Sequence, residues 1–208
     1  LEDGAYTNIA LNQYLRGSRL SDLDRRLATE LVYGTVKASG TLDWYLAQCV
    51  SRPLDKVAGD ILAILRISTY QLLYMTRIPA SAAVNEAVKL ARSVSHEGSA
   101  KFVNGVLRGL LRKQEAGAFV LPDAEKQDAD YLSLKYYHPR WLVKRWLGPW
   151  GRGGTERLLA FDNTAAPVCL RANTLVTTRD KLLADLTEMG AQVRASACLL
   201  YTSDAADE

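Results

Sequence analysis

Positively charged side chains recur at helical spacing in two stretches of this chain. In the first stretch, Lys101, Arg108 and Arg112 share one helix face with Asn104, and no acidic residue lies between Lys101 and Lys113. Cations spaced along a helix can follow the phosphates of a nucleic acid. The pattern therefore predicts an RNA-binding face at Lys101, Arg108 and Arg112. A solvated helix surface with no ligand is the alternative reading.

The second stretch is the most basic part of the sequence. Between Lys135 and Arg157 the only acidic residue is Glu156. Three cations lie within one turn of Trp141, namely Arg140, Lys144 and Arg145. An exposed tryptophan can stack on an unpaired base while neighbouring cations hold phosphates. We predict RNA contacts from these four residues; the alternative is that Trp141 lies against the domain surface.

The cysteines and histidines do not have the spacing of a metal or disulfide site. Cys49, Cys169 and Cys198 are far apart and form no CxxC pair, so neither a disulfide framework nor a zinc site is expected. With only two histidines, no metal is expected at all. No strand leads into a glycine-rich turn that could hold a nucleotide-like cofactor. A chain without disulfides fits a reducing, cytoplasmic location.

Two helices and a turn are expected between Pro79 and Lys113. Pro79 suits a first helical turn, and small apolar residues follow at steps of three and four. Gly98 is expected to end the first helix and Ser99 to cap the second. Gly105 and Gly109 inside the second helix each cost about 1 kcal/mol relative to alanine. That cost predicts close packing of both glycines against the alanine ridge formed by Ala83, Ala87 and Ala91.

The rest of the sequence predicts further helices and then a change of character. We expect helices from about residue 22 and over 42–50, and a long central helix over 57–74 that is apolar almost all round. Helices are also expected from Pro139 and over 155–161. The run 167–175 reads as a strand on which Cys169 is buried, followed by a helix over 179–189 and a second strand at 192–194.

Composition is compatible with one domain or one and a half. The chain has 208 residues, of which 48% are hydrophobic, enough for a core. No apolar run is long enough to span a membrane, so no membrane partner is expected. The net charge of +3 says little about partners. The chain opens without methionine on Leu1, which we interpret as a truncated N-terminus.

Several sequence motifs of this chain resemble those of a known family. AVNEAVKLA followed by FVNGVLRGLLR resembles the NusB-like helical domain. LSDLDRRLATELVYGTVKASGTLDWYL and ILAILRISTYQLLYMTRIPASAAVNEAV resemble the version of that domain at the front of the Sun/Fmu family. The resemblance implies a mainly α fold, a NusB-like bundle followed by the start of a small α/β subdomain. It implies four segments: a NusB-like RNA-binding domain (1–120), a helical linker (121–165), the start of a pre-catalytic α/β subdomain (166–197), and a tail (198–208) interpreted as non-native.

The resemblance also implies a function. Sun/Fmu proteins are bacterial methyltransferases that modify cytosine C5 in small-subunit ribosomal RNA. They use S-adenosylmethionine and a cysteine thiolate that adds to C6 of the base. The cofactor loop and the catalytic cysteines are absent here, so the chain is expected to be an inactive RNA-binding fragment of a methyltransferase. Its expected partners are ribosomal RNA and its own missing catalytic domain. Arg171 and Asn173 are further RNA-binding candidates, because their segment lies next to the substrate in the parent family.

One alternative function remains open. A free-standing NusB-type antitermination factor would bind RNA without catalysis. Such a factor should end soon after Lys113, yet this chain continues through YLSLKYYHPRWLVKRWLGPWG and PVCLRANTL. Both extensions match the methyltransferase family, so the sequence favours that reading.

Overall fold

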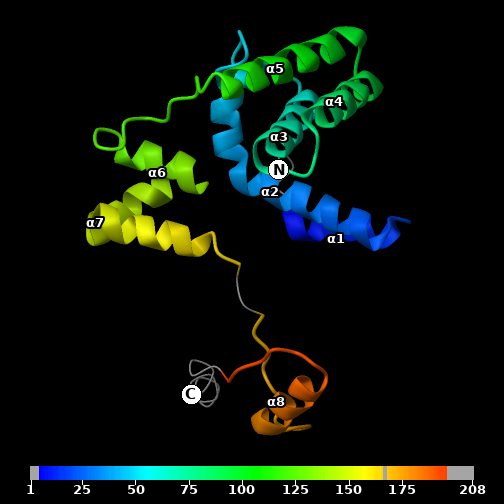
Figure 1. Ribbon diagram of the computed structural model, residues 1–208, viewed down its shortest axis with the longest axis vertical. Coiled ribbons are helices and arrows are strands. Elements are labelled where there is room, and N and C mark those ends of the chain that lie inside the picture. The colour runs from blue at the N-terminus through cyan, green and yellow to red at the C-terminus, as the bar shows by residue number, and fades with distance from the viewer. Residues whose placement is uncertain (1–4, 166–167, 196–208) are drawn as a thin grey trace. The chain divides into compact units, whose positions relative to one another are not determined.

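The computed structural model describes residues 5–165 and 168–195. The chain divides into two compact units, Leu1–Asn163 and Thr164–Glu208. All regular structure in the described ranges is helical, which confirms the predicted mainly α class. The helices of the first unit (Figure 1) are α1 Thr7–Gly17, α2 Asp22–Ala47, the short 3-10 helix η1 Leu54–Lys56, α3 Gly59–Tyr74, α4 Ala80–Val94, α5 Glu97–Glu115, α6 Asp128–Tyr136 and α7 Arg140–Asp162. In the second unit the described helix is α8, Arg179–Glu188.

Helix α3 is the centre of the first unit. It packs against α2, α4 and α5, and from Ile61 to Tyr74 only Ala63 is exposed. Leu65 is fully buried, together with Leu46 of α2 and Leu107 of α5. A helix covered on nearly every side needs apolar residues all round. The predicted central helix over 57–74 is therefore confirmed.

Helix α2 is one continuous element rather than the two that the sequence suggested. Ser21 caps its start by accepting a hydrogen bond from the backbone N–H of Asp24 at 3.2 Å. The helix continues to Ala47 through Gly34, because a close approach of α3 compensates for the propensity that glycine loses. A Cβ on Gly34 would overlap the ring of Tyr70, which lies directly against it.

The turn between α4 and α5 differs from the sequence expectation. Helix α4 already ends at Val94, and Gly98 lies in the first turn of α5 rather than at a helix end. The N-cap of α5 is His96, whose Nδ1 accepts a hydrogen bond from the backbone N–H of Ser99 at 3.3 Å. The prediction that Ser99 caps this helix is wrong, because the imidazole supplies the acceptor that a capping hydroxyl usually supplies.

Gly105 and Gly109 do not pack against the alanine ridge. Ala83, Ala87 and Ala91 are buried as expected, but α5 faces them with its valine and leucine side. A Cβ at Gly105 would have no atom within 4 Å, and one at Gly109 would meet only Arg112, 3.9 Å away. The close-packing prediction is wrong for both glycines. In α2 and α5, the helix approach that requires glycine is at Gly34.

Helices α6 and α7 form a second small core within the same unit. Leu132, Val143 and Leu159 are fully buried there. The Thr41 hydroxyl of α2 donates to the carbonyl oxygen of Leu134 at 2.9 Å, which ties α6 to the bundle. Helix α7 bends at Gly151, where φ is 60°. Its two arms correspond to the two helices expected from Pro139 and over 155–161.

The second unit contains α8, but its expected strands do not form. Residues 168–175 and 192–194 have no ladder hydrogen bonds, and Val168, Cys169 and Leu175 are exposed. A strand is stable only when a partner strand pairs its backbone, and the described residues supply none. The tail over 198–208 lies outside the described residues. No helix in the described part of the chain is long and apolar enough to cross a membrane.

A glycine that a neighbouring side chain covers, such as Gly34, and a glycine with open space above it, such as Gly105, should change stability in opposite directions when replaced by leucine. We expect Gly34→Leu to lower the free energy of unfolding by about 2 kcal/mol, because the new side chain would overlap Tyr70. Gly105→Leu should raise it by roughly 0.5–1 kcal/mol, because helix propensity improves and nothing is displaced. Urea denaturation of both variants measures the difference. A loss of stability in Gly105→Leu as large as in Gly34→Leu would restore the close-packing interpretation.

Candidate nucleic-acid interface

The outer face of α5 carries three exposed cations. The helix buries Val103, Leu107 and Leu110, so the residues on the opposite side meet solvent. Those residues include Lys101, Arg108 and Arg112. None of the three has a carboxylate within ion-pair distance in the described residues. We call these cations, with Asn104, Gly105 and Gly109, the α5 face.

The α5 face ends at Arg112, because the next residue, Lys113, is used inside the fold. The next cation along the helix, Lys113, is half-buried, and its Nζ donates to the backbone oxygen of Gln48 at the end of α2. That contact satisfies a carbonyl group that would otherwise have no partner inside its helix. Lys113 therefore stabilises the fold, whereas the three cations before it project from the surface.

The outer face of α7 combines a tryptophan with two cations. Trp141 is 65% exposed, and Lys144 and Arg145 are exposed one turn further on. All three lie opposite Val143, which is fully buried against α6. The described residues place no acidic partner on Lys144 or Arg145. We call these three residues the α7 face; they offer one aromatic ring and two charges to a ligand.

Arg140 is in a different electrostatic setting. It forms an ion pair with Asp130 of α6, and one guanidinium nitrogen donates to the carboxylate at 3.0 Å. Other basic residues of the same stretch are also engaged. Lys135 pairs with Glu156 at 2.9 Å, and Arg152 donates to the backbone oxygen of Ala124. Much of the positive charge counted in the sequence therefore holds α6 and α7 together.

The remaining predicted residues, Arg171 and Asn173, lie in the second unit and are both exposed. The Oδ1 atom of Asn173 accepts the backbone N–H of Leu175 at 3.1 Å. This side chain thus forms a local turn, as asparagine often does. Both residues belong to the second unit, whereas the α5 and α7 faces belong to the first.

Trp150 is an exposed aromatic residue that the sequence analysis missed. Its ring is 53% exposed and lies 6.1 Å from the ring of Trp146, at an interplanar angle of 33°. The four-residue spacing of the two tryptophans, just before the glycine-rich bend, was the signal that could have found it. Arg52 is a second residue that the sequence did not single out. Its guanidinium lies over the ring of Phe102, 4.5 Å from the ring centroid.

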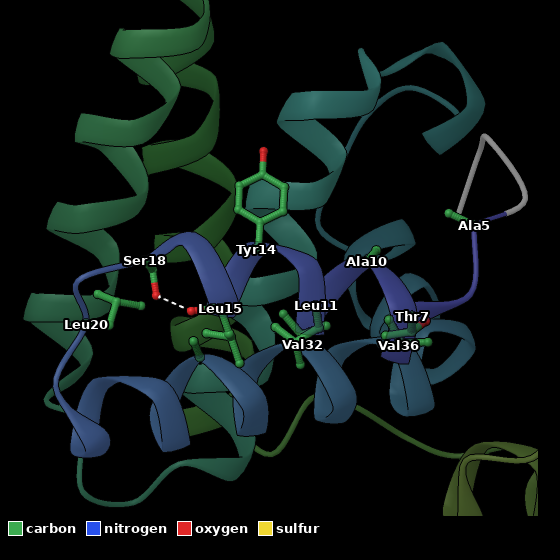
Figure 2. Close-up of a pocket in the computed structure, with 11 residues that line it drawn as sticks. Ala5, Thr7, Ala10, Leu11, Tyr14, Leu15, Ser18, Leu20, Val32 and Val36 are labelled. Atoms are coloured by element: carbon green, nitrogen blue, oxygen red, sulfur yellow. Dashed lines mark hydrogen bonds between the residues drawn. The ribbon is translucent and has the colours of Figure 1, made fainter.

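A cavity of about 430 Å³ lies between α1 and α2 (Figure 2). Leu11 and Leu15 of α1 and Val32 and Val36 of α2 form its walls, and no charged residue lines it. Its polar side chains are the hydroxyls of Thr7, Tyr14 and Ser18, and the Ser18 hydroxyl donates to the backbone oxygen of Leu15 at 2.9 Å. The lining offers no carboxylate, imidazole, amine or thiol for acid–base chemistry near neutral pH. Among the described residues no cluster of histidine, cysteine and acidic side chains could hold a metal ion.

The two described cysteines differ in burial. Cys49 is half-buried, and burial raises the pKa of its thiol above the ordinary value, against a smaller lowering effect from Lys113. A raised pKa keeps the thiol protonated at neutral pH, where it is a weak nucleophile. Cys169 is exposed, so the prediction of a buried apolar cysteine is wrong, because the strand that would have buried it is not formed.

The bundle around α3, with exposed cations on α5 and α7, defines a helical module whose surface chemistry suits a polyanion. Comparison with family models agrees with the helical bundle. The NusB family model matches residues 1–112, more than half of the chain, and the chain therefore belongs to the NusB family. A second model, described as a Methyltr_RsmF/B-like, ferredoxin-like domain, matches residues 138–201.

Curated relatives carry methyltransferase names. The chain is 39% identical to a probable ribosomal RNA small subunit methyltransferase B of Synechocystis sp., over 94% of this chain and 43% of that protein. It is 34% identical to the protein of the same name in Bacillus subtilis, over 92% of this chain and 42% of that protein. The chain thus spans about two fifths of the length of these relatives.

A solved structure also resembles this one. The crystal structure of PH0851 matches with a TM-score of 0.60 and 21% sequence identity, over 88% of this chain and 40% of that chain. At this identity the likeness supports the fold alone.

The two described cysteines should differ in reactivity. In a Cys198→Ser variant we expect one fast and one slow thiol when the protein reacts with a disulfide reagent near neutral pH. Cys169 should be fast because it is exposed, and Cys49 slow because it is half-buried with a raised pKa. A further Cys169→Ser substitution should remove the fast phase, whereas loss of the slow phase instead would contradict the assignment.

Proposed function

We propose that this chain is the RNA-recognising amino-terminal part of an S-adenosylmethionine-dependent methyltransferase that modifies cytosine C5 in small-subunit ribosomal RNA. The observation that carries the proposal is the order of the two family matches. A NusB-family bundle is followed in the same chain by a match to a domain that is described as methyltransferase-like. A NusB-type antitermination factor, the alternative, offers no account of the match over residues 138–201.

In this proposal the chain binds RNA and carries out no chemistry of its own. The α5 and α7 faces hold phosphates through their exposed cations, and Trp141 stacks on an unpaired base. Arg171 and Asn173 contact RNA from the second unit. Arg140 contributes less than Lys144 or Arg145, because Asp130 already neutralises it. The location is the cytoplasm, where ribosomal RNA is found.

The catalytic step belongs to a part of the protein that this chain does not contain. S-adenosylmethionine, bound there, supplies the methyl group. In this proposal Cys49 is not the nucleophile, because burial raises the pKa of its thiol. The role left to the chain is to bind ribosomal RNA and to orient it toward the catalytic part.

Salt dependence of RNA binding tests the α7 face. Each phosphate contact contributes roughly −0.7 to −0.9 to the log–log slope of affinity against salt. We expect the double variant Lys144→Gln with Arg145→Gln to flatten that slope by about 1.5 for a small-subunit ribosomal RNA transcript. Arg140→Gln should flatten it less, because Asp130 pairs with Arg140.

The controls separate charge from stacking. Arg26→Gln with Lys37→Gln removes the same charge from exposed positions on α2 and should leave the slope unchanged. Trp141→Leu should weaken binding without altering the slope, because stacking releases no ions. Identical slopes for the parent and the Lys144/Arg145 variant would show that the α7 face is only a solvated surface.

Cofactor binding independently tests the proposal that this chain binds RNA while another part of the protein carries out methyl transfer. We expect calorimetric titration of this polypeptide with S-adenosylmethionine to show no binding, and incubation with ribosomal RNA to transfer no methyl group. The reason is the absence of a cofactor loop and of an activated cysteine from the sequence. A dissociation constant in the micromolar range would contradict this assignment.

A further inference from the structure

We propose that the α5 face is a preformed seat for the sugar–phosphate backbone of RNA. Asn104 orients Arg108 there, and Gly105 and Gly109 let the strand approach the helix closely. This inference rests on the proposed function, because it assumes that the chain binds RNA. It adds the residues that shape the surface to those that carry its charge.

The first observation concerns how Arg108 is held. Its Nε donates to Oδ1 of Asn104 at 3.0 Å, one turn earlier on the same helix. The side-chain amide is neutral, so it fixes the guanidinium without cancelling its charge. The terminal nitrogens of Arg108 keep their donors for a ligand.

Other arginines on this protein are held by acids. Arg92 donates to the Glu97 carboxylate at 2.7 Å, and Arg140 is paired with Asp130. Those carboxylates compensate the charges that they orient. Arg108 therefore combines a fixed guanidinium with an uncompensated charge, and this combination favours binding of a phosphate.

The second observation concerns the space above the helix. Residues four, seven and eleven positions after Lys101 return to the same side of an α-helix, which places Gly105 between the cations Lys101 and Arg108. The face extends roughly 16 Å from Lys101 to Arg112, at about 1.5 Å per residue. At Gly105 the surface is open and low, since a Cβ there would meet nothing within 4 Å.

Neither glycine has a packing role inside the described chain that offsets its cost in helix propensity. Glycine in a helix interior is unfavourable relative to alanine, and its usual compensation is the close approach of another backbone. At Gly34 the approaching group is the side chain of Tyr70 on α3, whose ring lies against the glycine. At Gly105 and Gly109 no element of the described chain comes close, and the same is true at Gly40. Gly105 and Gly109 differ from Gly40 because they lie among the exposed cations Lys101, Arg108 and Arg112, which would draw a phosphate backbone to this open surface.

The chemistry of the face selects a nucleic-acid backbone as that ligand. No large apolar side chain of α5 is exposed, so a hydrophobic partner helix would find nothing to bury. Three cations that form no ion pair within the described residues are instead complementary to phosphates, although Glu97 lies close enough to Lys101 for the two charges to interact. Because a backbone carries no sequence information, we expect this face to position the RNA rather than to read its bases.

Enlarging the glycines tests the close approach. Gly105→Gln with Gly109→Gln adds bulk without charge, and glutamine is a good helix former. We expect the double variant to melt roughly 1–3 °C higher per site yet to bind the small-subunit ribosomal RNA transcript about tenfold or more weakly. The matched control is Gly40→Gln on α2, where a Cβ would also meet nothing within 4 Å. It should gain stability and keep full affinity.

Asn104 is tested by two substitutions of similar size. Asn104→Leu removes the acceptor, so it should weaken binding while leaving the salt slope unchanged. Asn104→Asp puts a carboxylate beside Arg108, so it should flatten the slope by roughly 0.7–0.9, the value of one contact. If Asn104 had only a structural role, the leucine and aspartate variants would not differ in the salt slope.

The outcomes separate this inference from the proposed function. If Lys101→Gln with Arg112→Gln flattens the salt slope while the glycine and Asn104 variants bind like the parent, the preformed seat is overturned and RNA binding stands. If the parent shows no affinity for the transcript at low salt, the proposed function fails and this inference fails with it. Weaker binding by the double glycine variant, together with full binding by Gly40→Gln, supports the seat.

Discussion

Burial of α3 on nearly every side is the constraint on which the rest of this structure depends. Leu65 is fully buried because α2, α4 and α5 surround it, and each of those helices must turn an apolar side inward. The remaining side of α5 then meets water, and its polar residues are exposed as a set. The cationic surface is thus a consequence of how the core is filled, and its chemistry is set by which polar residues occupy that one side.

Sequence periodicity predicted most of the helices around this core, although it divided α2 into two. It placed the central helix, the pair after Pro79 and the arms of α7, because amphipathic stripes reflect burial directly. It failed where the reason for a residue lies across the fold. Gly34 and Gly105 look alike in sequence, and only the position of Tyr70 distinguishes them. His96 replaced the expected cap, and the expected strands lacked partners, which no local pattern reveals.

Charge alone is likewise a poor guide to the candidate interface. Arg140 and Arg145 are both arginines and lie close together in the sequence. Asp130 nevertheless neutralises Arg140, whereas no acidic residue of the described chain neutralises Arg145. Lys113 looks like a continuation of the α5 face, but it caps the end of α2. What identifies a residue as available to a polyanion is the lack of an internal partner, and that property appears only in the folded chain. The α5 and α7 faces retain it.

Protection of individual lysines by RNA would test the central claim most directly, since that claim holds that these two faces contact ribosomal RNA. Brief acetylation of the protein, with and without the small-subunit ribosomal RNA transcript, followed by mass spectrometry, reports each lysine separately. The account predicts that RNA slows modification of Lys101 on α5 and Lys144 on α7, while the exposed Lys37 of α2 and Lys89 of α4 react at unchanged rates. Equal modification of Lys101 and Lys144 with and without bound RNA would contradict it.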